Sequence, residues 1–291
     1  MISIIITSYK EPNTIGKAIG SILKNNLKDY EILVTAPDKE TLDAAKQYSS
    51  KNRNIKLIKD FGKGKSLALN LAVSKAKGEI IVLSDGDVYV GENSINLILE
   101  LFKNNQVGAV SGNPVSLNPK NNMLGFWAYV LTNIANERRK KAVRLRKRLF
   151  CSGYLFAIRK KLFPVLPEEL LSEDGFISHK VYEQGYKIGY SEKSMVYIKY
   201  PTNIKDWITQ KKRSAGGYNQ IRKLTKIEIR SFKKESIGAF SLFKYISNFK
   251  EFLWLISLFL IRIYLWALVY KEINIQKKSH KNIWKRVEST K

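Results

Sequence analysis

"EIIVLSDGDVYV" (residues 79–90) places two carboxylates, Asp85 and Asp87, directly after an apolar run, with only Gly86 between them. Two interpretations fit this stretch. Asp and Gly commonly form the turn that ends a strand. Paired carboxylates at a fixed corner also suit a divalent cation, which prefers oxygen ligands. Short motifs match by chance, so the surrounding sequence must separate a plain turn from a metal site.

Further apolar runs on both sides of this stretch predict the strands of a sheet. The runs are continuous and not alternating, which is typical of parallel strands covered on both faces. Between them, apolar residues recur at helical spacing from Ile15 to Leu23 and from Ile95 to Phe102, and Asn13 or Thr14 is expected to cap the first helix. The expected strands are 3–7, 31–36, 55–58, 79–84 and 107–112.

This alternation of strands and helices predicts an α/β fold with an open, mostly parallel sheet flanked by helices. Sheets of this kind bind ligands beyond the carboxyl ends of their strands. Asp85 and Asp87 lie at such an end, so the motif is more than a plain turn.

The composition limits the chemistry that the chain can perform. It has 291 residues, with one cysteine, Cys151, and two histidines, His179 and His280. No disulfide can form within the chain, which fits a reducing compartment. A zinc site is not expected, because neither histidine has cysteine companions. The sequence starts in a strand-like run without a basic region and cleavage site, so we expect no signal peptide.

The net charge is +26, from 51 Lys and Arg against 25 Asp and Glu. Such an excess indicates an anionic partner, an anionic surface or a lysine-rich source proteome. Nucleic acid is the rival candidate, but the sequence has no helix-turn-helix, zinc-finger or aromatic RNP pattern. We therefore expect an anionic membrane surface and not nucleic acid.

Two segments could contact a membrane. Residues 124–148 run from an apolar, aromatic stretch into one with eight Lys or Arg, as in a basic surface helix or a helix on anionic headgroups. Residues 252–270 carry one charge, Arg262, and as a helix would be about 28 Å long, enough for the hydrocarbon core. Arg262 would then sit near mid-bilayer and both flanks are basic, so whether this segment spans or lies in the membrane stays open.

Three more stretches carry candidate site residues. "FGKGKSLALN" (61–70) lacks the spacing of a Walker loop and the third glycine of a dinucleotide fingerprint, but its helix start suits phosphate. Glu173 and Asp174 begin a helical segment, where acids complement the dipole or supply a general base. A basic helix, which is either a plain surface helix or an anion clamp, carries Trp207, Gln210 and Arg213 at i, i+3 and i+6.

Taken in order, "TSYKE", "GKGKSLALN", "DGD", "SGYLFAIRK", "SEDG" and "QKKRS" resemble the inverting family 2 glycosyltransferases of GT-A fold, from residue 1 to about 220. The chain is similar to the catalytic domain of cellulose and hyaluronan synthases, without their multi-span channel. The resemblance implies a GT-A sheet followed by a C-terminal hydrophobic, membrane-associated helix.

The resemblance also implies roles for individual residues. Asp87 would hold Mg²⁺ or Mn²⁺ against the donor diphosphate. Asp174, with Glu173 beside it, would be the catalytic base, and Gly153 and Trp207 would bind the acceptor. The implied donor-binding residues are Thr7, Tyr9, Glu11, Asp38, Lys65, Asp85, Gln210 and Arg213. Gly86 would let the backbone and the ligand approach closely.

Two departures from the family pattern affect specificity. After the second strand the family commonly has paired aspartates that read the nucleobase, but this chain has "VTAPDKE", where only Asp38 can substitute. Ser214 stands where the Gln-x-x-Arg-Trp motif has tryptophan, which speaks against processive polymerisation.

We therefore expect a catalytic domain over 1–235, with a nucleotide-binding half (1–112) and an acceptor half (113–235), and a membrane-associated segment with a basic tail over 236–291. The expected activity moves a sugar from a UDP- or GDP-sugar to a hydroxyl of a lipid-linked or other saccharide at the cytoplasmic face of the cell membrane. The alternatives are a polyprenyl-phosphate sugar synthase, a processive polysaccharide synthase, a scaffold without catalysis and a nucleic-acid-binding protein.

Overall fold

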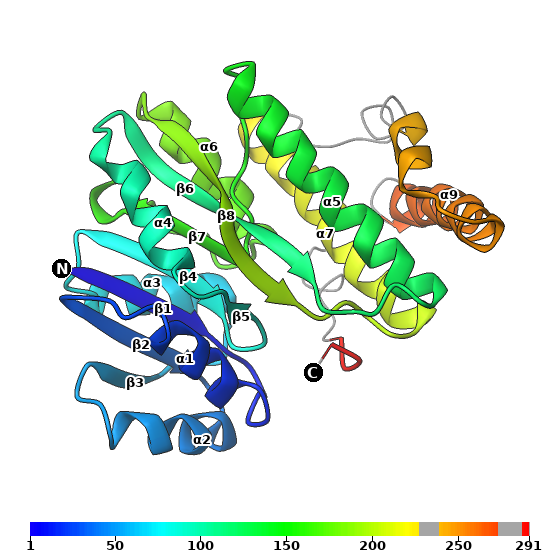
Figure 1. Ribbon diagram of the computed structural model, residues 1–291. Helices are drawn as coiled ribbons and strands as arrows, with labels where there is room; N and C mark the ends of the chain where they lie inside the picture. The colour runs from blue at the N-terminus through cyan, green and yellow to red at the C-terminus, as the bar shows by residue number, and fades with distance from the viewer. Residues whose placement is uncertain (227–238, 273–286, 291) are drawn as a thin grey trace.

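The computed structural model of the chain describes residues 1–226, 239–272 and 287–290. Its centre is an eight-stranded sheet with the order β3-β2-β1-β4-β7-β6-β8-β5 (Figure 1). The strands are β1 (Ile2–Thr7), β2 (Tyr30–Ala36), β3 (Ile55–Lys59), β4 (Ile80–Asp85), β5 (Tyr89–Val90), β6 (Val107–Ser116), β7 (Leu155–Arg159) and β8 (Lys187–Ile198).

The sheet is mixed, with a parallel block at its amino-terminal side. Strands β3, β2, β1 and β4 are parallel neighbours, and β6 is parallel to β8. Strand β7 runs antiparallel between β4 and β6, and β5 runs antiparallel at the edge. The five expected strands are all present. The periodicity did not predict β7, whose residues carry only a motif, nor β8 and the two-residue β5.

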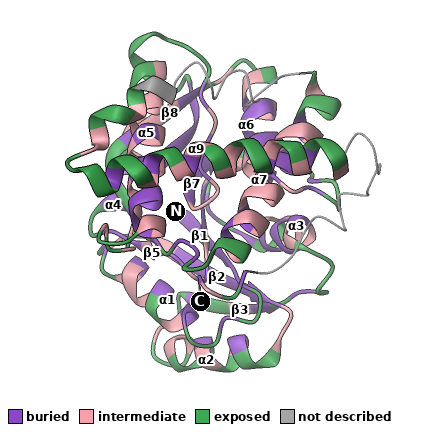
Figure 2. Ribbon diagram, turned by 90° about the vertical axis from the view of Figure 1, so that its right-hand side faces the viewer, coloured by how far each residue is buried: buried purple, intermediate pink, exposed green. Residues whose placement is uncertain are grey.

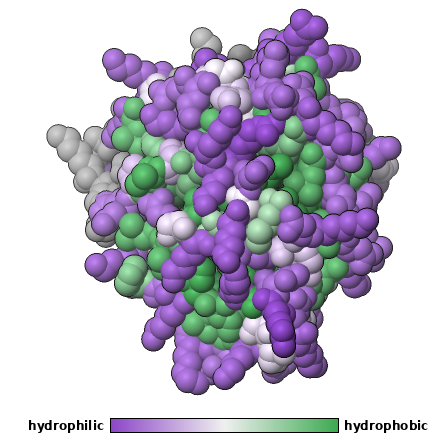
Figure 3. Space-filling view, turned by 90° about the vertical axis from the view of Figure 1, so that its left-hand side faces the viewer, coloured by the Kyte–Doolittle hydropathy of each residue, from purple (hydrophilic) through white to green (hydrophobic). Residues whose placement is uncertain are grey.

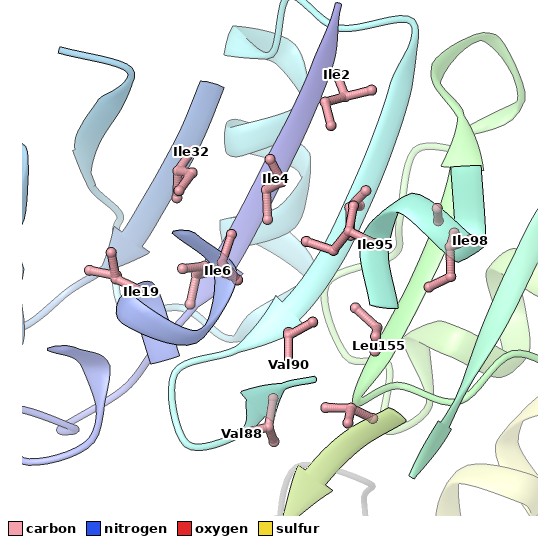
Figure 4. Packing of buried hydrophobic residues seen from close by; sticks show 14 of the residues in the cluster. Ile2, Ile4, Ile6, Ile19, Ile32, Val88, Val90, Ile95, Ile98 and Leu155 are labelled. Carbon is pink, nitrogen blue, oxygen red and sulfur yellow. The ribbon is translucent and has the colours of Figure 1, made fainter. Parts of the chain in front are cut away.

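Helices cover both faces of the sheet, as continuous apolar strands require. On one face, Ile4 and Ile6 of β1 pack with Ile19 of α1 (Ile15–Leu23) and Ile95 of α4 (Ser94–Glu100) (Figure 4). This face is completed by α2 (Lys39–Ser49). On the other face, Ile5 contributes to a second cluster with α3 (Lys65–Lys75) and α6 (Glu173–Glu183).

A third group of helices packs beside the sheet through tryptophan side chains. Trp127 of α5 (Met123–Arg144) and Trp207 of α7 (Ile204–Thr225) meet edge to face with ring centroids 5.2 Å apart. Leu255 and Leu258 of α9 (Phe249–Tyr270) complete this cluster. Helix α5 ends at Arg144, before the expected residue 148. Three short 3₁₀ turns are η1 (Leu101–Lys103), η2 (Lys160–Leu162) and η3 (Ala239–Tyr245).

Helix α9 contains the expected hydrophobic segment and lies across the surface of the rest of the protein, with mostly exposed residues turned outward (Figure 2). Within the described residues it is the one helix long and apolar enough to cross a membrane, by length and composition. The boundary expected at residue 235 falls outside the described residues. On the opposite side of the molecule, hydrophilic side chains surround smaller apolar areas (Figure 3).

Candidate donor and acceptor site

A pocket of about 1140 Å³ opens at the carboxyl ends of β1 and β4, where parallel sheets bind ligands. It brings together residues from both ends of the sequence, from Thr7 to Thr290. The expected site residues that line it are Thr7, Tyr9, Glu11, Lys65, Asp85, Asp87, Gly153, Glu173, Asp174, Gln210 and Arg213. Asp38 and Trp207 are not among its lining residues.

The register of the sheet places Asp85 at the base of the pocket. Thr7, the last residue of β1, is paired with Asp85, the last residue of β4. The Thr7 hydroxyl donates to Asp85 Oδ1 at 3.0 Å, and Lys65 Nζ donates to the same oxygen at 2.5 Å. Asp85 therefore faces the pocket already oriented by a neutral and a charged donor.

Gly86 is required by the packing of the first loop. A Cβ at this position would lie 2.3 Å from Ser8 Oγ and 2.5 Å from Glu11 Oε2. The Ser8 hydroxyl donates to Glu11 Oε2 at 2.6 Å, so this pair sits directly against the Asp-Gly-Asp turn. The glycine was expected to let a ligand approach the backbone closely. In the structure the absence of a Cβ leaves room for the Ser8–Glu11 pair.

Asp85 and Asp87 fit a divalent cation only in combination with substrate oxygens. In the described part of the chain, no cluster of three or more His, Cys, Asp or Glu side chains could hold a metal ion. Mg²⁺ commonly binds one or two carboxylates together with substrate phosphates and waters. Two carboxylates beside a pocket lined with basic residues suit such an incomplete, substrate-assisted site.

Asp174 is held in a fixed orientation. Its Oδ2 accepts from the Gly153 backbone N–H at 3.0 Å, and its Oδ1 accepts from Ser172 Oγ at 2.7 Å and Gly175 N at 2.8 Å. A Cβ on Gly153 would lie 3.3 Å from Oδ2. Gly153 thus supports the carboxylate that the family resemblance implies as the base, and this residue lines the pocket.

Glu173 and Lys65 form an electrostatic pair beside this carboxylate. Burial raises the pKa of Glu173, although Lys65 opposes that shift. Burial disfavours the charged form of Lys65, but Asp85 and Glu173 outweigh it and raise the pKa of its ammonium. A lysine that stays protonated among carboxylates is a fixed positive charge suited to phosphate. Ser66 Oγ lies 3.5 Å from Glu173 Oε1 and links α3 to α6.

Asp38 has a structural position. It caps α2, with Oδ1 accepting from Thr41 N at 3.0 Å, and its Oδ2 accepts from Lys10 N at 2.8 Å. Burial alone would raise the pKa of the Asp38 carboxyl, but hydrogen bonds from Thr41 and Lys10 hold that pKa below its ordinary value. Asp38 does not line the pocket, and its oxygens bind the β1–α1 loop and the start of α2, so its reading of the nucleobase stays a prediction.

Asp60 is a pocket residue that sequence reasoning missed. It is nearly completely buried and lines the pocket near Pro37. Its carboxylate accepts from Thr35 Oγ1 at 3.2 Å and from Gly62 N at 2.8 Å. The available signal was its position two residues after the predicted strand 55–58, close to the position that Asp85 has after its own predicted strand.

Helix α7 carries three expected site residues, of which two line the pocket and the third, Trp207, is buried in the core. Gln210 and Arg213 line the pocket, and Gln210 Oε1 has no hydrogen-bond partner in the structure although the side chain is buried. Trp207, expected to bind the acceptor, is completely buried against Trp127. In this conformation it cannot contact an acceptor, because it belongs to the core between α5, α7 and α9.

The far end of the pocket is formed by α5 and α9 and was not predicted. Leu258, Phe259, Ile263 and Trp266 of α9 give this end an apolar wall. Arg262 of α9 adds a basic side chain to this end, and Arg138, Arg139, Arg148 and Lys211 line the same pocket. The pocket therefore runs from the acidic strand ends to a region that is both apolar and cationic.

Comparison with known families gives a match over the first part of the chain. The sequence model of Glycosyl transferase family 2 matches residues 3–166, more than half of the chain. Poly-beta-1,6-N-acetyl-D-glucosamine synthase of Staphylococcus aureus (strain MSSA476) is 24% identical over 227 residues, and that of Staphylococcus epidermidis is 25% identical over 232 residues. Each alignment covers 76% of this chain and 55% of the relative, so the chain spans about half the length of these relatives.

Solved structures share the fold. The mannosyltransferase PcManGT from Pyrobaculum calidifontis, in complex with GDP-Man and Mn²⁺, has a TM-score of 0.62 at 16% identity, covering 97% of this chain and 82% of its own. S. aureus TarS 1-349 in complex with UDP-GlcNAc has a TM-score of 0.53 at 18% identity, covering 69% and 59%. These similarities identify the sheet and its helices as a GT-A fold.

Proposed function

The chain belongs to Glycosyl transferase family 2, and on that premise we propose that it transfers a sugar, with inversion, from a UDP- or GDP-sugar to a hydroxyl of a lipid-linked saccharide. One observation carries the proposal. The strand-end carboxylates Asp85 and Asp87 and the hydrogen-bonded carboxylate of Asp174 line a single pocket. The reaction needs a diphosphate site and a base within one pocket.

Each residue has a role in this reaction. Asp174 takes the proton of the acceptor hydroxyl as its oxygen attacks C1 of the sugar, while the bond from C1 to the diphosphate oxygen breaks. Arg213 and Lys65 offset the charge of the departing nucleoside diphosphate. Asp87, with Asp85 beside it, would hold Mg²⁺ or Mn²⁺, which supplies Lewis-acid stabilisation to the leaving diphosphate when bound.

The distal end of the pocket supports a lipid-linked acceptor. Its wall includes Leu258, Phe259 and Ile263 of α9, the apolar helix at the surface. An acceptor that carries a saccharide on a lipid could place its sugar near Asp174 and its lipid along α9. We place the reaction at the cytoplasmic face of the cell membrane, where nucleotide sugars are the donors.

A polyprenyl-phosphate sugar synthase is the second candidate, and the basic residues of the pocket favour it. Arg138, Arg139 and Arg262 line the pocket in addition to Lys65 and Arg213. A phosphate acceptor would use such charges, and because it is already an anion it needs no base. The two candidates therefore differ in how strongly turnover depends on Asp174.

The test uses the purified full chain and a panel of UDP- and GDP-sugars. We expect one donor to raise the melting temperature in the presence of Mn²⁺ and not in the presence of EDTA. Radiolabel from that donor should then enter the lipid extract of membranes. Asp174→Asn is the matched control for a hydroxyl acceptor, because it should bind the donor without transferring the sugar. No donor-dependent shift and no transfer with any sugar would refute the proposal.

A further inference from the structure

Helix α9 is apolar on two faces, but the protein covers only one of them. Leu255, Leu258, Leu265 and Val269 are buried against the catalytic body. The outward face is built of residues at helical spacing, namely Phe249, Phe252, Leu253, Ile256, Leu260, Ile263, Tyr264 and Tyr270, all exposed. Soluble proteins rarely expose a contiguous apolar surface of this extent, and one that does usually meets a partner or a membrane.

The helix is attached to the body along its whole length. Near its start, Trp127 Nε1 donates to the carbonyl of Trp254 at 2.7 Å, and Lys120 pairs with Glu251 at 3.0 Å. Beyond its end, Lys212 pairs with Glu272 at 2.7 Å. A helix crossing a bilayer away from the body would break these contacts and expose the tryptophan cluster. The packed arrangement keeps the axis of α9 parallel to the surface of the body.

The charges around α9 fit an anionic surface. Its two flanking acids, Glu251 and Glu272, are paired on the side that faces the protein. Lys250 and Lys271, at either end, are exposed. Lys250 also lies 5.0 Å from the centre of the Trp254 ring. The outward face is thus apolar in the middle and basic at both ends, the pattern of a helix that lies in an anionic membrane interface.

Arg262 separates a lying helix from a spanning one. In a spanning helix it would sit near the bilayer centre, where a charged side chain is costly. It lies instead at the edge of the packed face, is only partly exposed and lines the pocket. With α9 in the plane of the interface, this guanidinium sits at headgroup depth beside the pocket.

We infer that α9 docks in the plane of an anionic bilayer surface, with its outward face among the acyl chains, and does not span the bilayer. Ile263 belongs both to this outward face and to the pocket wall. The distal end of the pocket therefore opens at the bilayer surface. That this opening serves an acceptor rests on the proposed function, whereas the docking itself does not.

Three exposed positions on α9 test the orientation. Leu253, Leu260 and Ala267 lie two turns apart on the outward face, about 10 Å from one to the next along the axis. Leu253→Cys, Leu260→Cys and Ala267→Cys are each labelled with a fluorophore in the full chain. Cys151 is buried and burial raises its pKa to about 12, so the unsubstituted chain should take up no label. Vesicles of equal phosphatidylcholine and phosphatidylglycerol carry quenchers at a shallow or a deep acyl position.

An in-plane helix gives the same ratio of shallow to deep quenching at all three positions. Ser50→Cys, exposed just beyond α2, is the control and should not be quenched at either depth. Much stronger deep quenching at Leu260→Cys than at the other two would show a spanning helix and overturn the inference. Absence of vesicle binding would also overturn the inference. This includes the case in which a second copy of the chain covers α9 and keeps it from the vesicle. Sugar transfer is not measured here, so failure of the proposed function would leave these outcomes unchanged.

Discussion

At the scale of residues, each of the three residues in the Asp-Gly-Asp turn has a different structural position. Asp85 is oriented by Thr7 and Lys65, Gly86 makes room for the Ser8–Glu11 pair, and Asp87 faces the pocket. The interpretation as a turn is correct, and the interpretation as a metal site stays a prediction. The turn is the device that brings the second carboxylate to the pocket.

Asp87→Ala should abolish metal-dependent donor binding. A single remaining carboxylate, already bonded to Lys65, is a poor ligand for a hard cation and a diphosphate together. Titration calorimetry with a nucleotide sugar and Mn²⁺ measures the effect, and Asp43→Ala, on the surface of α2, is the control. Donor affinity that is unchanged both by the substitution and by EDTA would rule out the metal assignment.

Asp174→Asn should lower kcat by about 10²–10⁴-fold if the acceptor is a hydroxyl, the usual contribution of a general base. Donor binding should change little. The amide keeps one oxygen for Ser172 and Gly175 but turns its NH₂ toward the Gly153 N–H, so some loss of stability is also expected. Ser172→Ala is the matched control, because it removes one hydrogen bond and keeps the carboxylate. Near-normal turnover in Asp174→Asn would favour a phosphate acceptor.

Glu173→Gln should change how stability depends on pH. Because burial raises its pKa in the folded state, the protonated acid adds stability below the ordinary pKa, and this is lost as the pH rises through the folded-state value. At pH 7 the variant should be more stable than the wild type, with no difference in acid. Urea unfolding across pH measures this. A less stable variant at pH 7 would mean that Lys65 outweighs burial.

At the scale of elements, α9 shows how one hydrophobic segment can serve two environments. Its sequence has no polar stripe, so its period does not show which face meets the protein. The contacts with α5 and α7 divide it into a packed face and an outward face. The same helix thereby closes the distal end of the pocket and offers an apolar surface.

Substitution of two leucines, Leu258 on the packed face and Leu260 on the outward face, should affect stability differently. Leu258 is 1% exposed and Leu260 is 63% exposed. Leu258→Ala should lower the free energy of unfolding by about 2–5 kcal/mol, because it leaves a cavity in the tryptophan cluster. Leu260→Ala should stay within about 0.5 kcal/mol in solution. Chemical denaturation without lipid measures both, and equal losses would contradict the packing of α9 described here.

At the scale of the whole molecule, the charge of +26 acts together with the apolar face of α9. Charge attracts the protein to an anionic surface over a range set by salt, whereas burial of apolar side chains is insensitive to screening. The two contributions can therefore be separated in one assay.

Raising the salt from about 0.1 M to 1 M, which shortens the Debye length from about 10 Å to 3 Å, should weaken binding to anionic vesicles. We expect at least about a tenfold loss, since each Lys or Arg near such a surface contributes about 1 kcal/mol. Binding to phosphatidylcholine vesicles, measured by flotation, should be weaker and nearly constant. Salt-independent binding to both vesicle types would show that charge plays no part.

The sequence by itself determined the parallel strands, their flanking helices and the strand-end acids, because continuous apolar runs and helical spacing are local patterns. Asp85 ends a strand and Asp87 follows it by two residues, whereas Glu173 and Asp174 begin a helix and took their expected roles from the family resemblance. The tertiary structure alone showed that Asp38 is a helix cap, that Asp60 lines the pocket and that Trp207 belongs to the core. Those three facts depend on which elements pack together. Local periodicity carries no information about that packing. The sequence pattern around a tryptophan or an aspartate is the same whether its neighbour in space is a ligand or another helix.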